Sequence, residues 1–306
     1  MNKIAFVFPG QGAQYAGMGQ DFYEKMPVCK AVFDCSAQVT GLDLPELCFT
    51  ENSRLNITEY TQIAMLTVSA AILKAVEETG LSSCVNAGLS LGEYGALVAS
   101  KALTLEDAFA LVRKRGIFMQ EAVPFGGAMA AVMGLDGDAI AKICDAVTGT
   151  VSVANYNCPG QIVITGEAAA VETAGVKLKE AGARRIVPLK VSGPFHSKLL
   201  AGAGERLREE LKKAEIYPIE TPYVTNVTAE YVEDSGCVKD LLVRQVFSSV
   251  RWQQSVEKMI AGGVETFVEI GPGKTLSGFI RKISGDVTVM NIQNTEDFQK
   301  VMEHLA

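Results

Sequence analysis

Apolar residues in this chain occur in two kinds of stretch. Short, mostly apolar runs at 3–8 and 266–270 predict buried strands, and longer stretches at 58–80 and 104–123 predict helices. The same pattern predicts further elements at 199–214 (helix), 223–227 (strand) and 238–261 (helix). This alternation of strands and helices is typical of an α/β fold.

The segment 125–191 has its own order of elements. We expect strands at 128–134, 151–155, 161–165 and 185–191, and helices at 136–147 and 167–182. The resulting order, βαββαβ, is typical of a ferredoxin-like unit. At 306 residues the chain exceeds the usual size of one domain. We therefore predict a core formed by 1–124 and 192–306, with 125–191 as an insertion.

The sequence Gly88-Leu89-Ser90-Leu91-Gly92 lies between a short apolar run and a helix-compatible stretch. G-x-S-x-G between a strand and a helix is typical of a nucleophile elbow, a tight turn that lifts a serine hydroxyl clear of the sheet. A Cβ at position 88 or 92 would crowd such a turn. The N–H of Leu91 would point toward an oxyanion formed at Ser90. A glycine-rich turn with an incidental serine is the alternative.

Arg115 interrupts the apolar face of the helix expected at 104–123. The other residues of this face recur three or four positions apart: Leu105, Ala108, Val112 and Met119. A guanidinium carried into apolar surroundings is costly unless an anion meets it. The commoner outcome is an arginine that reaches solvent or pairs with an internal carboxylate. Its position relative to Ser90 decides between these alternatives.

Ser90 requires a base, and the chain has two histidines. His304 is close to the C-terminus, where chains fray. His196 lies in a turn sequence between a predicted strand and a predicted helix, where catalytic side chains are commonly presented. We therefore expect His196 to activate Ser90. No acidic residue can be selected as a third member, and a backbone carbonyl could hold the imidazole tautomer instead.

Composition narrows the class of protein. With 48% hydrophobic and 21% charged residues, the chain is typical of a soluble globular protein. No apolar stretch approaches the roughly 20 residues of a membrane span, and the N-terminal run is too short for a signal peptide. Seven scattered cysteines without a C-x-x-C pair indicate neither a disulfide framework nor a zinc site. We therefore expect a cytoplasmic protein with reduced thiols and no membrane association.

Charge and glycine-rich stretches bear on partners and cofactors. A formal charge of −7 argues against a nucleic-acid partner. The segment 177–213 nevertheless has ten Lys or Arg against four Glu, which is commonly a solvated face but could steer an anionic partner. A dinucleotide fingerprint starting at Gly10 would need Gly or Ala at position 15, where this chain has Tyr15. A P-loop ending at Gly273-Lys274 would need Gly at position 268, where this chain has Val268. We therefore expect no bound cofactor and no metal.

Several short motifs occur together along nearly the whole chain. They are Phe8-Pro9-Gly10-Gln11-Gly12, Thr61-Gln62, Gly88-Leu89-Ser90-Leu91-Gly92-Glu93-Tyr94, Arg115-Gly116, Met119-Gln120, Asn157-Cys158-Pro159-Gly160-Gln161, Phe195-His196-Ser197, Thr225-Asn226-Val227 and Gly271-Pro272-Gly273-Lys274. With these motifs the chain resembles the malonyl-CoA:acyl-carrier-protein transacylases of fatty-acid synthesis, which are related to the acyltransferase domains of polyketide synthases.

The resemblance implies an α/β-hydrolase-like core with a ferredoxin-like insertion, in agreement with the order of elements expected above. It implies transfer of a malonyl group from malonyl-CoA to the phosphopantetheine thiol of acyl carrier protein, through a malonyl-serine intermediate. No metal or bound cofactor takes part in such a transfer. We expect the protein to act as a monomer.

Carried over residue by residue, the resemblance implies Ser90 as nucleophile and His196 as general base. The implied substrate-binding residues are Gln11 and Leu91, whose N–H groups would hold the oxyanion, Arg115, which would pair with the malonate carboxylate, and Gln62 in the pocket. Two departures stand out: many members have His where this chain has Leu89, and some have Gln where it has Arg251, at a position whose main-chain carbonyl supports the catalytic histidine. A serine esterase or thioesterase on a related fold, and a non-catalytic carrier-binding module, are the alternatives.

Overall fold

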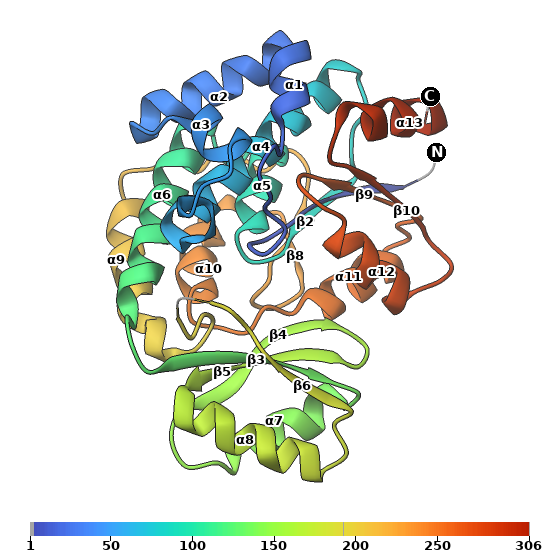
Figure 1. Cartoon of the computed structure of the whole chain (residues 1–306). Coiled ribbons are helices and arrows are strands. Elements are labelled where there is room, and N and C mark those ends of the chain that lie inside the picture. Colours follow the sequence, from blue (N-terminus) through green and yellow to red (C-terminus); the bar gives the residue numbers. More distant parts are fainter. Residues whose placement is uncertain (1–2, 192, 306) are drawn as a thin grey trace.

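The computed structural model describes residues 3–191 and 193–305 and contains two β-sheets with helices packed around them (Figure 1). This mixed α/β content agrees with the predicted class. The second predicted boundary between core and insertion falls at Ser192, which lies outside the described residues. Within the described ranges, no helix is both long and apolar enough to cross a membrane.

The larger sheet has six strands in the order β10-β9-β1-β2-β7-β8. In chain order they are β1 (Ile4–Phe8), β2 (Val85–Gly88), β7 (Tyr223–Val224), β8 (Tyr231–Val232), β9 (Thr266–Ile270) and β10 (Thr288–Ile292). Neighbouring strands are parallel except β7 and β8, which are antiparallel. Parallel strands covered on both faces consist of near-continuous apolar runs. The predictions at 3–8 and 266–270 are correct for this reason.

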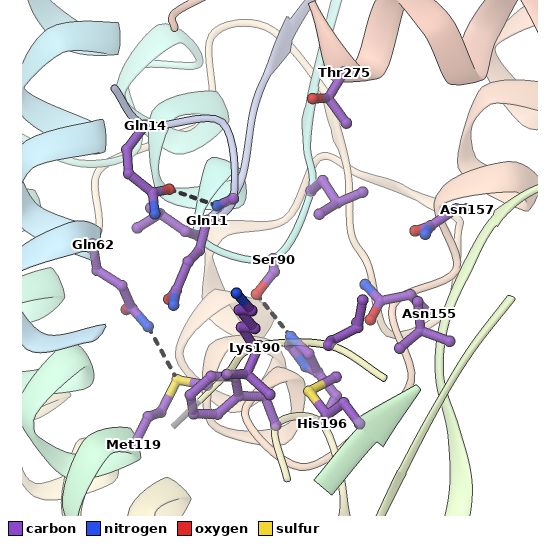
Figure 2. Close-up of a pocket in the computed structure, with 18 of the residues that line it drawn as sticks. Gln11, Gln14, Gln62, Ser90, Met119, Asn155, Asn157, Lys190, His196 and Thr275 are labelled. Carbon is purple, nitrogen blue, oxygen red and sulfur yellow. Dashed lines mark hydrogen bonds between the residues drawn. The ribbon is translucent and has the colours of Figure 1, made fainter. Parts of the chain in front are cut away.

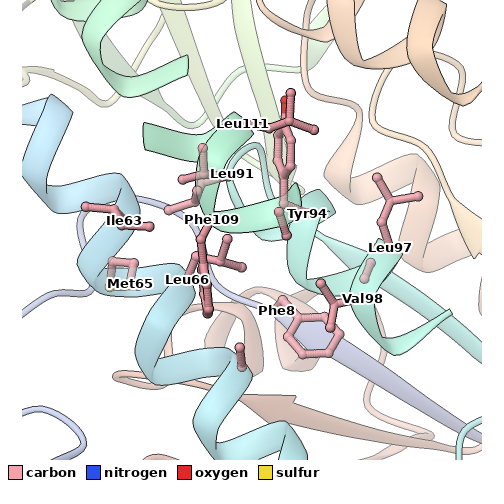
Figure 3. Close-up of a cluster of buried hydrophobic side chains, with 14 of the residues drawn as sticks. Phe8, Ile63, Met65, Leu66, Leu91, Tyr94, Leu97, Val98, Phe109 and Leu111 are labelled. Atoms are coloured by element: carbon pink, nitrogen blue, oxygen red, sulfur yellow. The ribbon is translucent and has the colours of Figure 1, made fainter. Parts of the chain in front are cut away.

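The core on one side of this sheet is built around α4 (Thr58–Glu78), which is buried on almost every side. A helix that is apolar all round packs inside a domain rather than on its surface. Figure 3 shows Ile63 and Leu66 of α4 beside Phe8 of β1, Tyr94 of α5 (Gly92–Ala99) and Phe109 of α6 (Leu105–Ala122). The carboxyl ends of β1 and β2 therefore rest on a closely packed base.

Further helices surround this core. They are α1 (Gln20–Lys25), α2 (Pro27–Thr40), α3 (Leu44–Phe49), α9 (Ala201–Leu211), α10 (Val238–Gln245), α11 (Trp252–Ala261), α12 (Thr275–Ile283) and α13 (Thr295–Leu305), with 3-10 turns at Arg54–Asn56, Lys198–Leu200 and Ser235–Cys237. The sequence analysis did not predict α1, α2, α3, α12, α13, β8 or β10.

The smaller sheet has four strands in the order β4-β5-β3-β6, and every neighbouring pair is antiparallel. Its elements follow one another as β3 (Gly127–Met133), α7 (Gly137–Asp145), β4 (Val151–Cys158), β5 (Gln161–Glu167), α8 (Ala168–Glu180) and β6 (Arg185–Pro188). In Figure 1, α7 and α8 cover the face of this sheet that points away from the larger sheet. The opposite face is turned toward the core.

The prediction of one continuous helix at 238–261 is wrong. The chain leaves the helix after Gln245 and begins α11 at Trp252. Between them, the N–H of Val250 donates to the carbonyl oxygen of Ala154 at 2.8 Å, and its carbonyl oxygen accepts from the N–H of Tyr156 at 2.9 Å. The backbone of this segment thus pairs with β4 instead of continuing the helix, and it connects the core to the smaller sheet.

Other predicted elements are shorter than expected. The helix at 199–214 is a 3-10 turn followed by α9, the strand at 223–227 ends at Val224, and the strand at 185–191 ends at Pro188. Proline has no N–H to continue a ladder, which accounts for the end of β6.

Candidate active site

The turn between β2 and α5 carries Ser90. A Cβ on Gly88 would lie 1.9 Å from the carbonyl carbon of Gly92, and a Cβ on Gly92 would lie 2.0 Å from the carbonyl oxygen of Phe8. Close approach of the backbone therefore requires both glycines. Ser90 itself has a φ of 54°, in the left-handed region that residues with a Cβ rarely adopt. Such strain persists only where the surrounding structure over-determines it.

Two amide side chains hold the backbone of this turn. The N–H of Ser90 donates to Oδ1 of Asn226 at 2.6 Å, and Nδ2 of Asn226 donates to the carbonyl oxygen of Gly88 at 2.6 Å. Nε2 of Gln245 donates to the carbonyl oxygen of Ser90 at 2.9 Å. The sequence analysis gave neither amide a role, although Asn226 lies in one of the motifs that carried the resemblance.

His196 lies beside Ser90, with 2.8 Å between Nε2 and the serine Oγ. Its Nδ1 lies 2.9 Å from the carbonyl oxygen of Gln245. Because a carbonyl oxygen can only accept, we assign the imidazole proton to Nδ1, which leaves Nε2 to accept from the hydroxyl. Burial, and then the positive charge of Arg115, lower the pKa of His196 to about 4. The imidazole is therefore neutral near pH 7 and able to take a proton.

The carbonyl that orients His196 belongs to Gln245, so the expectation that it lies at Arg251 is wrong. The carbonyl oxygen of Arg251 instead accepts from the N–H of Ser255 at 2.9 Å, in the first turn of α11. Gln245 is the last residue of α10, and the final carbonyls of a helix have no partner within it. The end of α10 therefore supplies the acceptor that an acidic residue provides in many serine enzymes.

Arg115 reaches the serine from α6 and is only 1% exposed. Its Nη2 donates to Oγ of Ser90 at 3.1 Å and to Oε1 of Gln245 at 3.0 Å, and its Nη1 donates to Oε1 of Gln62 at 2.6 Å. Its Nε has no hydrogen-bond partner in the described part of the chain. All three acceptors are neutral. This buried cation thus lies beside the serine, and no carboxylate of residues 3–191 or 193–305 forms an ion pair with it.

Glu93 is a buried carboxylate that the sequence analysis did not name as a site residue. Its Oε2 accepts from Nε2 of Gln245 at 2.7 Å and from the N–H of Asn226 at 3.1 Å. Burial raises its pKa to about 7, although these hydrogen bonds oppose the shift. A glutamate in the first turn of a helix is common, so its position in the sequence gives no signal of this role.

A cavity of about 700 Å³ lies beside Ser90, between the core and the smaller sheet. Five of the six predicted site residues line it, namely Gln11, Gln62, Ser90, Leu91 and His196. In Figure 2, Ser90 and His196 lie near the centre of this lining, with Gln62 on one side and Asn155 of β4 on the other. Arg115 is not part of the cavity wall and lies behind it, in contact with Ser90 and Gln62.

The N–H groups of Gln11 and Leu91 lie on two loops that pack together. The N–H of Leu89 donates to the carbonyl oxygen of Phe8 at 3.0 Å, and a Cβ on Gly10 would lie 2.5 Å from the carbonyl oxygen of Leu89. Within residues 3–191 and 193–305, neither N–H donates a hydrogen bond. Both remain available to an oxyanion.

The described residues contain no group of three or more His, Cys, Asp or Glu that could hold a metal ion. All seven cysteines are free thiols.

A serine hydroxyl hydrogen-bonded to an oriented imidazole, beside a cavity with free N–H donors, has the geometry of an enzyme that acts through an acyl-serine. The profile of the acyl transferase domain matches residues 5–294 of the chain, which is nearly all of it. The chain is thus an acyl transferase by its family, a class to which a site of this geometry is suited.

Individual relatives narrow this class. The chain is 45% identical to the malonyl CoA-acyl carrier protein transacylase of Bacillus subtilis, over 100% of this chain and 98% of that protein. The structure of this chain matches that of the Clostridium perfringens malonyl CoA-acyl carrier protein transacylase with a TM-score of 0.96 and 44% identity, over 99% of this chain and 97% of that one. It also matches a malonyl-transacylase in complex with its type II PKS acyl-carrier protein, with a TM-score of 0.96 and 39% identity over 99% and 100% of the chains. The chain belongs to the malonyl CoA-acyl carrier protein transacylase family.

Proposed function

We propose that the protein transfers a malonyl group from malonyl-CoA to the phosphopantetheine thiol of acyl carrier protein, through a malonyl ester of Ser90. The observation that carries this proposal is the 2.8 Å contact between Oγ of Ser90 and Nε2 of His196, with the guanidinium of Arg115 3.1 Å from the same oxygen. A nucleophile beside a buried cation suits an acyl group that carries a negative charge. The similar proteins are named for the same transfer.

In the first half-reaction, Nε2 of His196 takes the hydroxyl proton as Oγ of Ser90 attacks the thioester carbonyl of malonyl-CoA. The C–S bond then breaks, and the sulfur of coenzyme A leaves with the proton that His196 returns. In the second half-reaction, the carrier thiol gives its proton to His196 and attacks the ester carbonyl. Oγ of Ser90 then leaves and regains that proton, so the enzyme ends as it began.

The N–H groups of Gln11 and Leu91 hold the oxyanion that forms in each half-reaction. Leu91 precedes the first turn of α5, where the helix dipole also favours negative charge. Both N–H groups are free of internal hydrogen bonds in the described structure, which supports this role.

The malonyl carboxylate binds Arg115 and displaces the side chain of Gln62 from it. Nη1 of Arg115 is bonded to Oε1 of Gln62, an amide oxygen that stands where a carboxylate oxygen would. A carboxylate is a stronger acceptor than an amide for a guanidinium. Gln62 lines the cavity, and its Nε2 makes only a weak 3.5 Å contact with Sδ of Met119 among the described residues. Displacing this side chain would open Arg115 to the substrate.

We also propose that the architecture is an α/β-hydrolase-like core, residues 1–124 and 192–306, with a ferredoxin-like insertion at 125–191. The parallel order of β9, β1 and β2 with Ser90 after β2 supports the first part. The strand order β4-β5-β3-β6 and the βαββαβ sequence of elements support the second. The acyl group would lie in the cavity between these parts, away from bulk water.

The acidic carrier protein would dock on the basic segment 177–213. The C-terminal part of this segment is neutralised by its own acids, because Lys212 pairs with Glu209 at 2.7 Å. By contrast, six exposed cations of the segment make no ion pair in the described part of the chain: Lys177, Lys179, Arg184, Arg185, Lys190 and Lys198. One solved relative is in complex with an acyl-carrier protein. We further propose that the enzyme is cytoplasmic and monomeric.

Intact-protein mass spectrometry after mixing with malonyl-CoA tests the transfer. The wild type should gain the mass of one malonyl group on Ser90, keep it without a thiol acceptor and lose it to the carrier protein. Ser90→Ala should fold and gain nothing, and an adduct on this variant would refute the nucleophile. Rapid release of free malonate would favour the alternative, a serine esterase or thioesterase. Carrier binding without any acyl adduct would indicate a non-catalytic module.

A further inference from the structure

Glu93 is a charged group that the proposed reaction does not use. It lies in the first turn of α5, three residues after Ser90, and is 0% exposed. A buried carboxylate is costly unless it is paired with positive charge or well hydrogen-bonded. The nearby cation is Arg115, and each of the two charges acts on the pKa of the other.

A single amide joins these two charges. Nε2 of Gln245 donates to Oε2 of Glu93 at 2.7 Å, and Oε1 of Gln245 accepts from Nη2 of Arg115 at 3.0 Å. A carboxylate can only accept hydrogen bonds and a guanidinium can only donate them. The amide of Gln245 therefore has one permitted orientation between them. The charges of Glu93 and Arg115 are balanced through this amide without direct contact.

We propose that Glu93 is the counter-ion of Arg115, held one amide away by Gln245 so that the guanidinium stays free for the substrate carboxylate. A carboxylate in direct contact would occupy the guanidinium fork with two hydrogen bonds. With the amide in between, Nε of Arg115 has no hydrogen-bond partner in the part of the chain that the structure describes. This inference rests on the proposed function, because it assigns the malonyl carboxylate to Arg115.

The arrangement has a consequence for selectivity. The negative charge of Glu93 repels the carboxylate of a malonyl group at Arg115, and it does not act in this way on a neutral acetyl group. Glu93 therefore limits how tightly the site holds an acyl group that must later be passed on. Its hydrogen bonds are to Gln245 and Asn226, and it does not contact the reacting atoms, so it is not a catalytic residue.

Glu93→Gln is the discriminating variant. A glutamine at this position keeps one oxygen that can accept from both Asn226 and Gln245, so the Ser90 turn keeps its hydrogen bonds while the charge is lost. Glu269→Gln is the matched control. Glu269 is also 0% exposed, but it lies in β9, and its Oε1 and Oε2 accept one hydrogen bond each, from the N–H groups of Leu276 and Ser277. Glu269→Gln therefore removes a buried carboxylate, together with one of its hydrogen bonds, at a position outside the Ser90 turn.

The assay compares the kcat/KM of Ser90 acylation by malonyl-CoA with that by acetyl-CoA at pH 8. At this pH the carboxylate of Glu93 is ionised, since its pKa is about 7. Glu93→Gln should raise the malonyl-to-acetyl ratio about tenfold, mainly through the KM for malonyl-CoA, because it removes a like charge that is near the malonyl carboxylate but not in contact with it. Glu269→Gln should leave the ratio unchanged.

A ratio that stays the same in Glu93→Gln, or falls, would overturn the inference, even if both substrates react more slowly. Equal slowing would indicate a structural role only. A wild type that forms no malonyl-Ser90 would instead overturn the proposed function, and this inference with it.

The wild type provides a second test if Glu93→Gln does not fold. The ionisable groups that act on Glu93 are Arg115 of α6, Tyr94 of α5 and Tyr223 of β7, and burial raises the pKa of both tyrosines. None of the three changes charge between pH 6 and pH 8, and neither does His196, whose pKa is about 4. A higher malonyl-to-acetyl ratio at pH 6 than at pH 8 supports the inference, and equal ratios overturn it.

Discussion

Replacing Arg115 with alanine tests how the site recognises its acyl group. Among the described residues, Nε of Arg115 has no hydrogen-bond partner, and Nη1 is bonded to the neutral amide of Gln62. A malonyl carboxylate that takes both donors would form two charge-assisted hydrogen bonds, each contributing about 1.5–3 kcal/mol. At the lower end the pair contributes about 3 kcal/mol, which corresponds to roughly 10²-fold in kcat/KM. Malonyl loading of Ser90 should fall by this factor in Arg115→Ala.

Acetyl loading should respond differently to the same change. An acetyl group has no carboxylate, so in the wild-type site the buried guanidinium of Arg115 has no anion in direct contact while acetyl-CoA is bound. Arg115→Ala should therefore keep or increase the rate of acetyl loading. Arg115→Lys should restore malonyl loading poorly, because an ammonium group cannot reproduce the planar fork of a guanidinium.

The assay is the rate of acyl-Ser90 formation from each thioester, followed by intact-protein mass spectrometry after rapid quenching. Arg113→Ala is the matched control, because Arg113 is on the same helix and pairs with Glu59 at 3.0 Å, away from Ser90. This control should leave the malonyl-to-acetyl ratio unchanged. If the ratio is also unchanged in Arg115→Ala, the arginine is structural and recognition of the carboxylate lies elsewhere.

Two further predictions concern the base and the carrier. His196→Ala should slow acylation by about 10²–10⁴-fold. In the wild type, kcat/KM should fall only as the pH drops through about 4, because only the neutral imidazole accepts a proton and the pKa of His196 is lowered to about 4. An inflection near the ordinary imidazole value of about 6.5 would contradict this. Arg185→Glu or Lys198→Glu should weaken transfer to the carrier protein more than acylation by malonyl-CoA, and high salt should reduce the effect. Lys212→Glu, at a lysine paired with Glu209, should have less effect, and equal loss in both half-reactions would exclude docking on this segment.

The sequence predicts well those elements that are fully buried or that begin at a local capping motif. β9 has the predicted bounds because all five of its residues are buried. α6 begins where the sequence indicates, since Oγ1 of Thr104 accepts from the N–H of Asp107 at 3.1 Å and caps the helix. β10 was missed because four of its five residues are only partly buried or exposed, and its pattern is neither a continuous apolar run nor a clear alternation.

The break between α10 and α11 could not be predicted from local sequence. Residues 246–251 contain neither glycine nor proline, so nothing in them stops a helix. The interruption comes from Val250, whose N–H and carbonyl pair with β4. This pairing belongs to tertiary structure, which routinely overrides propensity. The sequence pattern therefore predicts helix through residues 246–251, although Val250 of this segment pairs with β4 of the smaller sheet.

The same break explains why the candidate site was predicted only in part. A serine between two glycines and the scarcity of histidine indicate Ser90 and His196 without knowledge of the fold. Gln245 gives no such signal, because it lies within a stretch that reads as one helix. Yet its carbonyl orients His196, its Nε2 holds the carbonyl of Ser90 and its Oε1 accepts from Arg115. The first of these contacts requires α10 to end at Gln245, since one more turn of helix would bond that carbonyl internally. The orientation of His196, the proposed base, thus depends on the pairing of Val250 with β4, after which α10 cannot continue. This tertiary contact cannot be read from the local sequence.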